Sequence, residues 1–536
     1  MSTNLIGVNE VGAAQSIPRS EIEAPMVILD SISTSKANIS SVDARDDKSA
    51  ELAELLNSKK YVTIDTQIAL NNEVKTTLPF QQIIGAPGCN LLIGPDMGNR
   101  TALRIAGNNS IVERIQMRNP LEVADRTIKT TRQGALAIEA HNVTVARSYF
   151  EQMLHSVYVL STGEWYGSLI DGNFAVECLG AGAGPTDQTS TWGEDKGDAF
   201  AVWGAGATVV NNFASAKAGQ DCRIAFHAEG MPGSRTNQNP LTDEADFIFA
   251  NNKAIGSFRR HYVFEGVKRG IMNGNISAGG ATWWNVALIQ TKDVTVSNML
   301  LHVTRTADDY TGQNWNPDRA AMYFMNYSQR NKFSNIKAFW APDAAVQGLS
   351  AKDDGKDPEG LGHVQSVIEN VELYMNPASR KRGMNIMQLK SPTLKNIHIE
   401  NCAEPIFGFN SSCIAKISGL NVKNFTGAVY CEGNATGGMM IDGANLDNSE
   451  MTTGGAASAI RSVNTGFTSV KNVNITNVDT LLHITNGAKV THLTAAQNQS
   501  IGSVAKIAVD YQTSGTLPVQ PNILNNIDII GSFTKA

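Results

Sequence analysis

Short runs of alternating apolar and polar residues recur along most of the chain, most clearly between Gly197 and His302. Each repeat has a short alternating run, a corner containing glycine or lysine, and a second run that ends in asparagine or glycine. Alternation is typical of strands, in which successive side chains point to opposite faces. The four clearest repeats read GDAFAVWGAGATVVNN, QDCRIAFHAEG, RRHYVFEGVKRGIMNGN and TWWNVALIQTKDVTVSNM.

The same unit can be followed from Ile111 to Ile523, and several of its intervals are 23 to 26 residues long. A unit of this length accommodates three short strands and three corners, at roughly 3.3 Å per strand residue. The pattern predicts an all-β solenoid, a stack of parallel strands, and not a leucine-rich repeat or a propeller. We expect the asparagines that end the second runs to bond one another along the stack. They are Asn211, Asn298, Asn335, Asn370, Asn396 and Asn472.

The repeat divides the chain into three parts. Residues 1–44 are polar and weakly patterned, which predicts an extended arm without a core of its own. Residues 45–440 are expected to form the solenoid with its functional groove, and residues 441–536 to form its C-terminal end and a candidate trimerisation region. Longer intervals predict loops that enclose one face of the middle coils, at 177–196, 229–244, 304–318 and 341–364.

A short amphipathic helix is predicted before the first strand. Asp46 or Asp47 can cap it, it ends near Asn57–Ser58, and the strand Tyr61–Ile64 follows. We expect the helix to shield the open end of the stack, where an exposed strand edge invites pairing with other chains. Its apolar face consists of Leu52, Leu55 and Leu56.

Composition and charge narrow the classes of function. The 536 residues carry a formal net charge of −6 without a long basic run, which argues against nucleic acid as a partner. No apolar run approaches the ~20 residues of a membrane span, and the N-terminus lacks the features of a secretory signal. The six cysteines have no metal-ligand spacing and are expected to be buried thiols. We therefore expect synthesis in a reducing cytoplasm, no membrane partner, and no metal or cofactor.

The helix with Asp46-Asp47 before it, followed by the strand at Tyr61, resembles the start of a right-handed parallel β-helix of the pectin-lyase-like class. Over about 45–536 the chain is most similar to bacteriophage tailspikes that depolymerise surface polysaccharide. The resemblance implies a homotrimer on the virion, attached to phage tail or baseplate proteins by residues 1–44 and acting outside the cell on bacterial capsule or O-antigen. The FGAxGDG-like lead-in of that class and a separate trimerisation module are missing.

The second clear repeat carries a row of charged side chains. Strand alternation places the small and apolar side chains on one face, which we interpret as the inward face. The opposite face is then an outward row of acid, base and imidazole groups, which is a candidate active site. The inward set is Cys222, Ile224, Phe226 and Ala228, and the outward set is Asp221, Arg223, Ala225, His227 and Glu229.

Neighbouring repeats add residues to this row. Trp203 and Glu265 precede their second runs by the same number of residues, and His261 lies two alternations before Glu265. We expect Glu229 and Glu265, on adjacent coils, to be the acid pair of a glycoside hydrolase, with Asp221 or Asp198 in reserve. Carboxylates on adjacent coils suit a retaining hydrolase, and a diagonal or skipped coil suits an inverting one.

Two alternatives stay open at this point. A lyase would use His227 or His261 as the base and Arg223 or Arg260 to neutralise a uronate carboxylate. A non-catalytic fibre or adhesin would bind glycan without cutting it. Hydrolysis is favoured because carboxylates outnumber well-placed bases, and the acidic, tryptophan-lined middle favours an enzyme.

Aromatic side chains near the insertions are candidates for stacking on sugar rings. Of the adjacent Trp283 and Trp284, one is expected to lie in the core. The other aromatic candidates are Trp165, Trp192, Trp203, Tyr310 and Trp315.

Overall fold

A computed structural model describes residues 47–497 with gaps, and five short strands outside that range. The outer strands are β1 (Ile6–Val8), β2 (Ala14–Ser16), β3 (Val27–Ile28), β45 (Ala505–Val509) and β46 (Ile527–Ile530). The gaps within 47–497 fall at 99, 121–133, 161–164, 181–196, 204–205, 219–221, 231–245, 280–282, 305–318, 326–327, 353–362, 410–413, 434–436, 452–457, 479 and 486–489.

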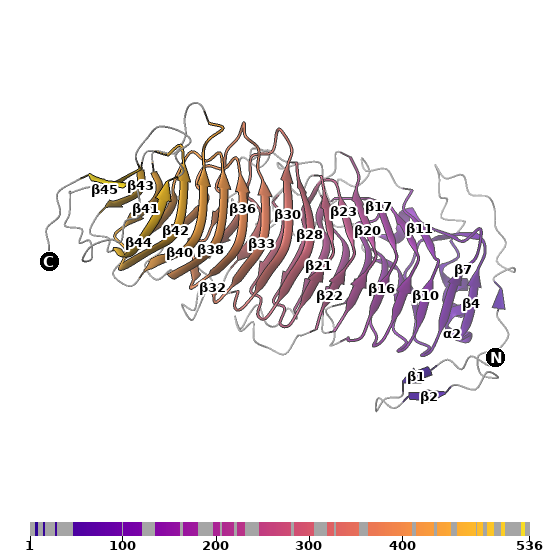
Figure 1. Ribbon diagram of the computed structural model, residues 1–536. Helices are drawn as coiled ribbons and strands as arrows, with labels where there is room; N and C mark the ends of the chain where they lie inside the picture. Colours follow the sequence, from indigo (N-terminus) through magenta and orange to yellow (C-terminus); the bar gives the residue numbers. More distant parts are fainter. Residues whose placement is uncertain are drawn as a thin grey trace, which may run out of the picture.

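Parallel strands stack into one elongated solenoid, with helix α2 (Ser49–Ser58) at one end and β44 (Val490–Gln497) near the other (Figure 1). In the first half each coil contributes one strand to each of three sheets. The first sheet contains β4 (Tyr61–Ile64), β7 (Gln82–Gly85), β10 (Ile111–Glu113), β13 (Thr144–Ala146), β16 (Leu169–Asp171), β19 (Thr208–Val210), β22 (Ile248–Ala250) and β25 (Ile271–Asn273). The second contains β5 (Gln67–Leu70), β8 (Asn90–Ile93), β11 (Gln116–Arg118), β14 (Tyr149–Glu151), β17 (Phe174–Cys178), β20 (Phe213–Ala216), β23 (Lys253–Ile255) and β26 (Ile276–Ala278).

The third sheet runs along the whole solenoid and carries the side chains of interest. Its strands are β6 (Val74–Thr76), β9 (Thr101–Ile105), β12 (Gly134–Ile138), β15 (His155–Val159), β18 (Asp198–Trp203), β21 (Cys222–Glu229), β24 (Phe258–Glu265), β27 (Trp284–Ile289), β29 (Ala320–Met325), β31 (Gln347–Lys352), β34 (Met384–Asn385), β37 (Ile406–Phe409), β39 (Val429–Glu432), β41 (Ser458–Val463), β43 (Thr480–Thr485), β45 and β46. A 3₁₀ turn (Pro95–Met97) and a small pair, β32 (His363–Val364) with β35 (Leu389–Lys390), lie apart from these sheets.

From β28 (Thr295–Val303) onward the first two sheets continue as one, because a single long strand spans both. The first residues of β28 pair with β25 and its later residues pair with β26. The remaining long strands are β30 (Lys332–Trp340), β33 (Val367–Tyr374), β36 (Thr393–Glu400), β38 (Ile414–Lys423), β40 (Gly438–Asp447), β42 (Phe467–Thr476) and β44. Parallel strands joined by crossovers wind with a right hand. The predicted right-handed parallel β-helix is therefore confirmed.

The predicted asparagine ladder is present in part at the corner between the first two sheets. Of its six predicted members, Asn211 and Asn472 donate instead to Asp171 and Asp442, each at 2.8 Å. Asn298, Asn335, Asn370 and Asn396 have φ between 52° and 55°, and each side-chain amide donates to the asparagine of the preceding coil at 2.8–3.0 Å, with Asn273 the first acceptor. Asparagine tolerates this left-handed conformation better than most residues. The ladder therefore fixes the corner and links the coils.

A second asparagine ladder, not predicted, lies inside the solenoid. The backbone N–H groups of Asn173, Asn212 and Asn252 each donate to the side-chain oxygen of the asparagine one coil further on, at 2.9 Å, ending at Asn275. These side chains are almost fully buried. They satisfy backbone groups that a corner would otherwise bury without a partner.

The predicted helix covers the end of the stack, with one change at its start. Leu52 and Leu56 are fully buried and Leu55 packs against them at the edge of the core, as expected. The helix begins one residue later than a cap at Asp47 requires, because Lys48 occupies the N-cap position. Asp47 instead accepts backbone N–H groups from Ser49 at 2.9 Å and from Asn71 at 3.0 Å, which ties the helix to the first coil.

Strict alternation fails at one place in β21, which corrects the predicted inward and outward sets. Ala225 belongs to the interior cluster next to Phe226, whereas Ile224 belongs to a separate apolar cluster. Ala225 and Phe226 thus both face inward, although the register of β21 with β18 and β24 continues without a shift. His227 and Glu229 follow the slip and keep the predicted outward face.

Candidate active site

Three neighbouring strands of the third sheet end in side chains that form one row. Trp203, Glu229 and Glu265 are the last residues of β18, β21 and β24 and are paired in register. Residues in register on parallel strands share a face. The preceding residues on β21 and β24, Ala228 and Phe264, are buried in the interior, so the row lies on the outer face.

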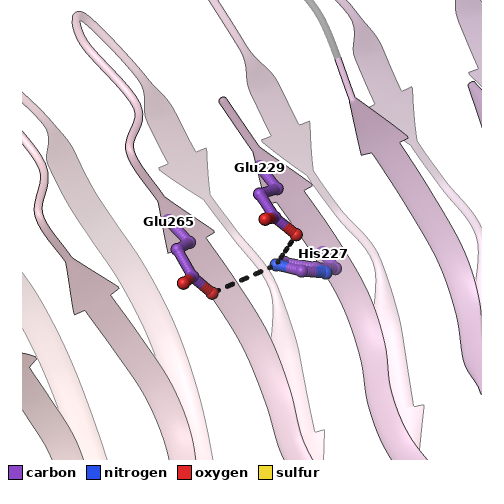
Figure 2. Close-up of side chains that lie close together, drawn as sticks. All are labelled: His227, Glu229 and Glu265. Atoms are coloured by element: carbon purple, nitrogen blue, oxygen red, sulfur yellow. Dashed lines mark ion pairs between the residues drawn. The ribbon is translucent and has the colours of Figure 1, made fainter. Parts of the chain in front are cut away.

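His227 lies between the two carboxylates (Figure 2). Its Nε2 atom is 3.6 Å from Glu229 Oε2 and 3.7 Å from Glu265 Oε2. One oxygen of each glutamate and one ring nitrogen of His227 all lie within 4.8 Å of one another. The side-chain exposure is 1% for His227, 9% for Glu229 and 18% for Glu265, so the cluster opens outward through Glu265.

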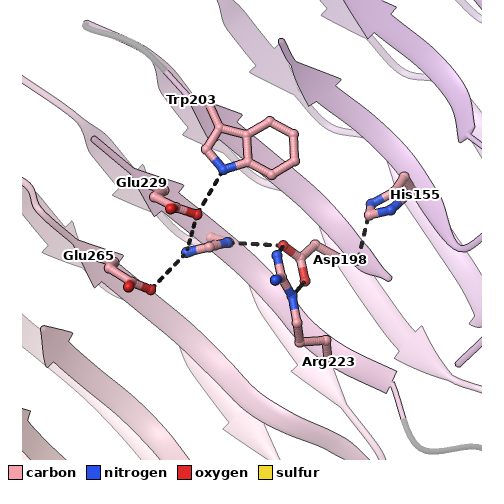
Figure 3. A network of polar contacts seen from close by, with 7 residues as sticks. His155, Asp198, Trp203, Arg223, Glu229 and Glu265 are labelled. Atoms are coloured by element: carbon pink, nitrogen blue, oxygen red, sulfur yellow. Dashed lines mark hydrogen bonds and ion pairs between the residues drawn. The ribbon is translucent and has the colours of Figure 1, made fainter. Parts of the chain in front are cut away.

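A buried carboxylate sets the orientation of the imidazole (Figure 3). Asp198 Oδ2 lies 2.9 Å from His227 Nδ1, and Asp198 Oδ1 accepts Arg223 Nε at 2.6 Å. A second guanidinium nitrogen of Arg223 donates to the other oxygen of Asp198. Because Asp198 accepts at Nδ1, the Nε2 atom is the one directed at the glutamates.

This arrangement shifts the pKa values of Asp198 and His227. Burial alone would raise the pKa of Asp198, but the charge and hydrogen bonds of Arg223 and the hydrogen bond from His227 outweigh it and hold that pKa well below its usual range. Burial alone would lower the pKa of His227, but the contacts with Asp198 and Glu265 raise it above its ordinary value. The charged form of the imidazole is therefore favoured between the carboxylates.

Glu229 receives a further donor. The indole N–H of Trp203 donates to Glu229 Oε2 at 2.9 Å. Glu229 thus has a fixed hydrogen bond and the imidazole on its two sides, whereas Glu265 is twice as exposed. The two carboxylates have different surroundings, as an acid and its partner require.

An arginine–tryptophan cluster adjoins the row on the same sheet. The guanidinium of Arg260 lies 5.0 Å from the ring centroid of Trp283 and 4.9 Å from that of Trp284, and Arg259 lies 5.0 Å from Trp283. Trp284 stacks on Tyr323 at 4.2 Å. Burial lowers the pKa of Arg260 to about 10. The cluster supplies positive charge beside the carboxylates.

His261 and one residue of the Trp283–Trp284 pair occupy other positions than expected. His261 faces the interior, because it is aligned with Ala225 at the slip in alternation; it contacts Ser277 Oγ at 2.6 Å and the carbonyl of Gly256 at 3.0 Å. It is therefore turned away from the outer row that contains His227 and the two glutamates. Trp283 and Trp284 are both buried, at 3% and 0% exposure, so neither presents an open ring face to sugar.

Asp198 and Arg223 have other roles than the sequence predicted. Asp198, the reserve acid, is fully buried beneath Arg223 and His227, and therefore positions other groups. Arg223, expected to bind substrate, is engaged by Asp198. Asp221, Trp192, Tyr310 and Trp315 lie outside the described residues.

Sequence reasoning assigned no role to His155, which is part of the network. Its Nδ1 atom accepts the backbone N–H of Asp198 at 3.2 Å. The register of β15 with β18 brings the two residues together. His155 and Asp198 are 43 residues apart, which is longer than the regular repeat, so counting intervals did not identify them as neighbours.

The fold and the row together define a right-handed parallel β-helix with an acid–imidazole cluster on its third sheet. No family model and no curated protein matches the sequence. Among solved structures, a mutant tailspike protein of E. coli bacteriophage HK620 in complex with hexasaccharide is 10% identical, with 97% of this chain and 82% of that chain covered and a TM-score of 0.47.

Two other solved structures have similar architecture. The pre-mature bacteriophage phi29 gene product 12 is 10% identical, with 91% of this chain and 70% of that chain covered and a TM-score of 0.48. The catalytic domain of a GH87 α-1,3-glucanase in complex with tetrasaccharides is 12% identical, with 70% and 66% covered and a TM-score of 0.43. At these identities the likeness is one of fold.

Two further findings concern membrane-spanning helices and the cysteines. No helix within the described residues is long and apolar enough to cross a membrane. Five of the six cysteines are buried and carry no disulfide, and Cys413 lies outside the described residues. Burial raises the pKa of Cys178 to about 12, so its thiol is a poor nucleophile.

Proposed function

We propose that this protein cleaves polysaccharide by glycosidic hydrolysis, with Glu229 and Glu265 as the pair of carboxylates. The observation that carries the proposal is their register pairing, with oxygens within 4.8 Å of each other. Retaining hydrolases hold their carboxyl groups about 5–5.5 Å apart, whereas inverting hydrolases leave room for water at about 6.5–9.5 Å. The short separation supports a retaining mechanism.

The surroundings of the two glutamates support distinct roles. The Trp203 indole N–H and the His227 imidazole, whose pKa is raised, both favour negative charge on Glu229, which suits the nucleophile. Glu265 is more exposed and suits the acid and base. Glu229 attacks the anomeric carbon and forms an ester as the glycosidic C–O bond breaks, and Glu265 gives its proton to the leaving oxygen.

The second step restores the enzyme. Glu265, now a carboxylate, takes a proton from water, and the water oxygen attacks the anomeric carbon as the ester to Glu229 breaks. One water is consumed per bond cleaved.

A lyase mechanism has less support from the site. Its base would have to be His227, because His261 faces the interior. The pKa of His227 is raised, and its Nε2 atom points at two carboxylates. Because the raised pKa keeps this imidazole charged up to a higher pH than usual, less of it is free to accept a sugar proton at a given pH.

The biological setting is part of the same proposal. A bacterial capsule or O-antigen as the substrate, a homotrimer, and a place on a phage tail or baseplate come from the resemblance seen in the sequence. Residues 1–44 would attach the protein to the virion, and 441–536 would support the trimer. A groove that binds glycan without cutting it is the competing interpretation.

Glutamine substitution tests the carboxylate pair. Glu229→Gln and Glu265→Gln should each lower cleavage by at least about 10³-fold, because each removes one of the two acid groups the mechanism needs. The measurement is product release by mass spectrometry from a panel of capsule and O-antigen polysaccharides.

The matched control is Glu432→Gln, which removes a carboxylate from the end of another third-sheet strand, β39. It should keep full activity. Cleavage that survives in Glu229→Gln would contradict the proposal. Products lacking the added water, with ultraviolet-absorbing unsaturated ends, would indicate a lyase, and binding without shortened chains would indicate a non-catalytic fibre.

A further inference from the structure

We propose that His227, Glu229 and Glu265 also form a binding site for a divalent transition-metal ion of the Zn²⁺ class. The three residues present one imidazole nitrogen and two carboxylate oxygens within 4.8 Å of one another. The His227 Nε2 atom is buried, points between the glutamates, and makes no hydrogen bond to the residues that the structure describes. The polar atom that lacks a hydrogen bond thus faces two negatively charged ligands.

The distances fit an ion of this size. An ion at equal distance from the three atoms would lie about 2.1–2.4 Å from each, given the 3.6 and 3.7 Å contacts and the 4.8 Å limit. Zinc binds imidazole nitrogen and carboxylate oxygen at about 2.0–2.2 Å, so shifts of a few tenths of an ångström complete the site. Mixed imidazole and carboxylate ligands favour Zn²⁺ over the oxygen-preferring Ca²⁺ and Mg²⁺.

The surrounding residues have the arrangement that supports metal ligands in proteins. Metal-binding histidines typically donate their other ring N–H to a carboxylate, which fixes the tautomer and the ring. Asp198 occupies that position at His227 Nδ1, at 2.9 Å, and Arg223 holds Asp198 in turn. Trp203 likewise holds Glu229 through its indole N–H.

The ion would compete with the proposed chemistry, and this consequence rests on the proposed function. A metal bound to Glu229 and Glu265 occupies the oxygens that attack the sugar and carry the proton. We therefore expect the ion to be a reversible inhibitor, removable by a chelator. The more exposed Glu265 gives it a route in from solvent.

Direct binding to chelator-treated protein tests the site without any sugar. Titration with ZnCl₂ by calorimetry, and with Co²⁺ by its visible absorption, should show one site per chain. His227→Asn and Glu265→Gln should weaken binding by at least about tenfold, and Asp198→Asn by about 10–100-fold through the misplaced imidazole. His398→Asn, at another histidine paired with a glutamate, should leave binding unchanged.

The outcomes separate the two proposals. No binding, or equal binding by wild type and the His227 and Glu265 variants, would overturn the metal site and leave the hydrolase intact. One-site binding that the variants lose, with cleavage restored by chelator, supports both. One-site binding that increases cleavage supports the metal site and overturns the metal-free carboxylate mechanism.

Discussion

At the scale of single residues, the outer and inner histidines of neighbouring strands have opposite environments. His227 contacts three carboxylates, and its pKa is raised; His261 contacts a hydroxyl and a carbonyl inside the solenoid, and burial lowers its pKa to about 4. Both histidines lie within Gly197–His302, where the alternation of apolar and polar residues predicts the face of each side chain. Strict alternation predicted the face of His227 correctly and that of His261 wrongly, because the break in alternation shared by Ala225 and His261 is set by packing and leaves no mark in the spacing of polar residues.

The buried His261 predicts loss of stability in mild acid. The unfolded imidazole takes up a proton near pH 6.5 and the folded one near pH 4, so the unfolded state binds more protons between these values. The stabilisation is complete above about pH 6.5 and falls as the pH drops to about 4, by up to about 3 kcal/mol. Melting temperatures at pH 7, 5.5 and 4.5 should decrease in that order.

A non-titrating variant separates this effect from general acid denaturation. His261→Gln keeps a side chain that donates and accepts hydrogen bonds, and it should melt at a lower temperature at pH 7 but lose less on acidification. Asp198 contributes at lower pH, because its depressed pKa makes its stabilisation fall only below about pH 4. An equal pH-dependent decrease in wild type and His261→Gln would rule out His261 as the cause.

At the scale of strands and corners, much of the architecture was predictable. Alternation predicts the strands, and the repeat length predicts the size of each coil. The asparagines that end the second runs predict the corner between the first two sheets. Alternation selected Glu229, interval counting selected Glu265, and the register of β21 with β24 pairs the two. His155 and the internal asparagine ladder were not predictable, because each depends on which residues two coils bring together and not on a local pattern.

The corner ladder predicts a specific order of stabilities. Asn335→Ala removes two side-chain hydrogen bonds. It also places alanine at a φ of 54°, a left-handed conformation that alanine disfavours by roughly 1–2 kcal/mol. Asn335→Gly also loses the hydrogen bonds but adopts this φ freely. The glycine variant should therefore melt between wild type and the alanine variant.

The chain itself uses glycine at this corner further along. Gly419 and Gly443 hold the corresponding positions of β38 and β40, with φ of 65° and 76°. An Asn335→Gly variant less stable than Asn335→Ala would contradict this prediction, because both variants lose the same two hydrogen bonds and differ in how well they adopt the left-handed φ.

At the scale of the whole molecule, the solenoid needs its end covered. Each coil contacts mainly its neighbours, so the first coil has an end face with no further coil on it, and within the described residues helix α2 packs on that face. Leu52 and Leu56 fill that face and are fully buried. Stability and solubility are therefore coupled at this end of the chain.

Truncation of the covering side chains tests this coupling. Leu52→Ala and Leu56→Ala should each cost about 2–5 kcal/mol and favour aggregation through the exposed edge. Leu55→Ala, at the half-buried neighbour, should cost less. Melting temperature and size-exclusion chromatography give both readouts. Aggregation equal in all three variants would show that the helix does not protect the edge.

The register of β21 with β24 has a consequence for how this protein can diversify. The separation of Glu229 and Glu265 is set by the hydrogen-bonded spacing of two adjacent strands and by their common register. The segments that join these strands to the rest of the coil do not affect that separation. New corner segments can therefore be exchanged or lengthened while the two carboxylates keep their separation, so that under the proposed function one acid pair can serve different glycans.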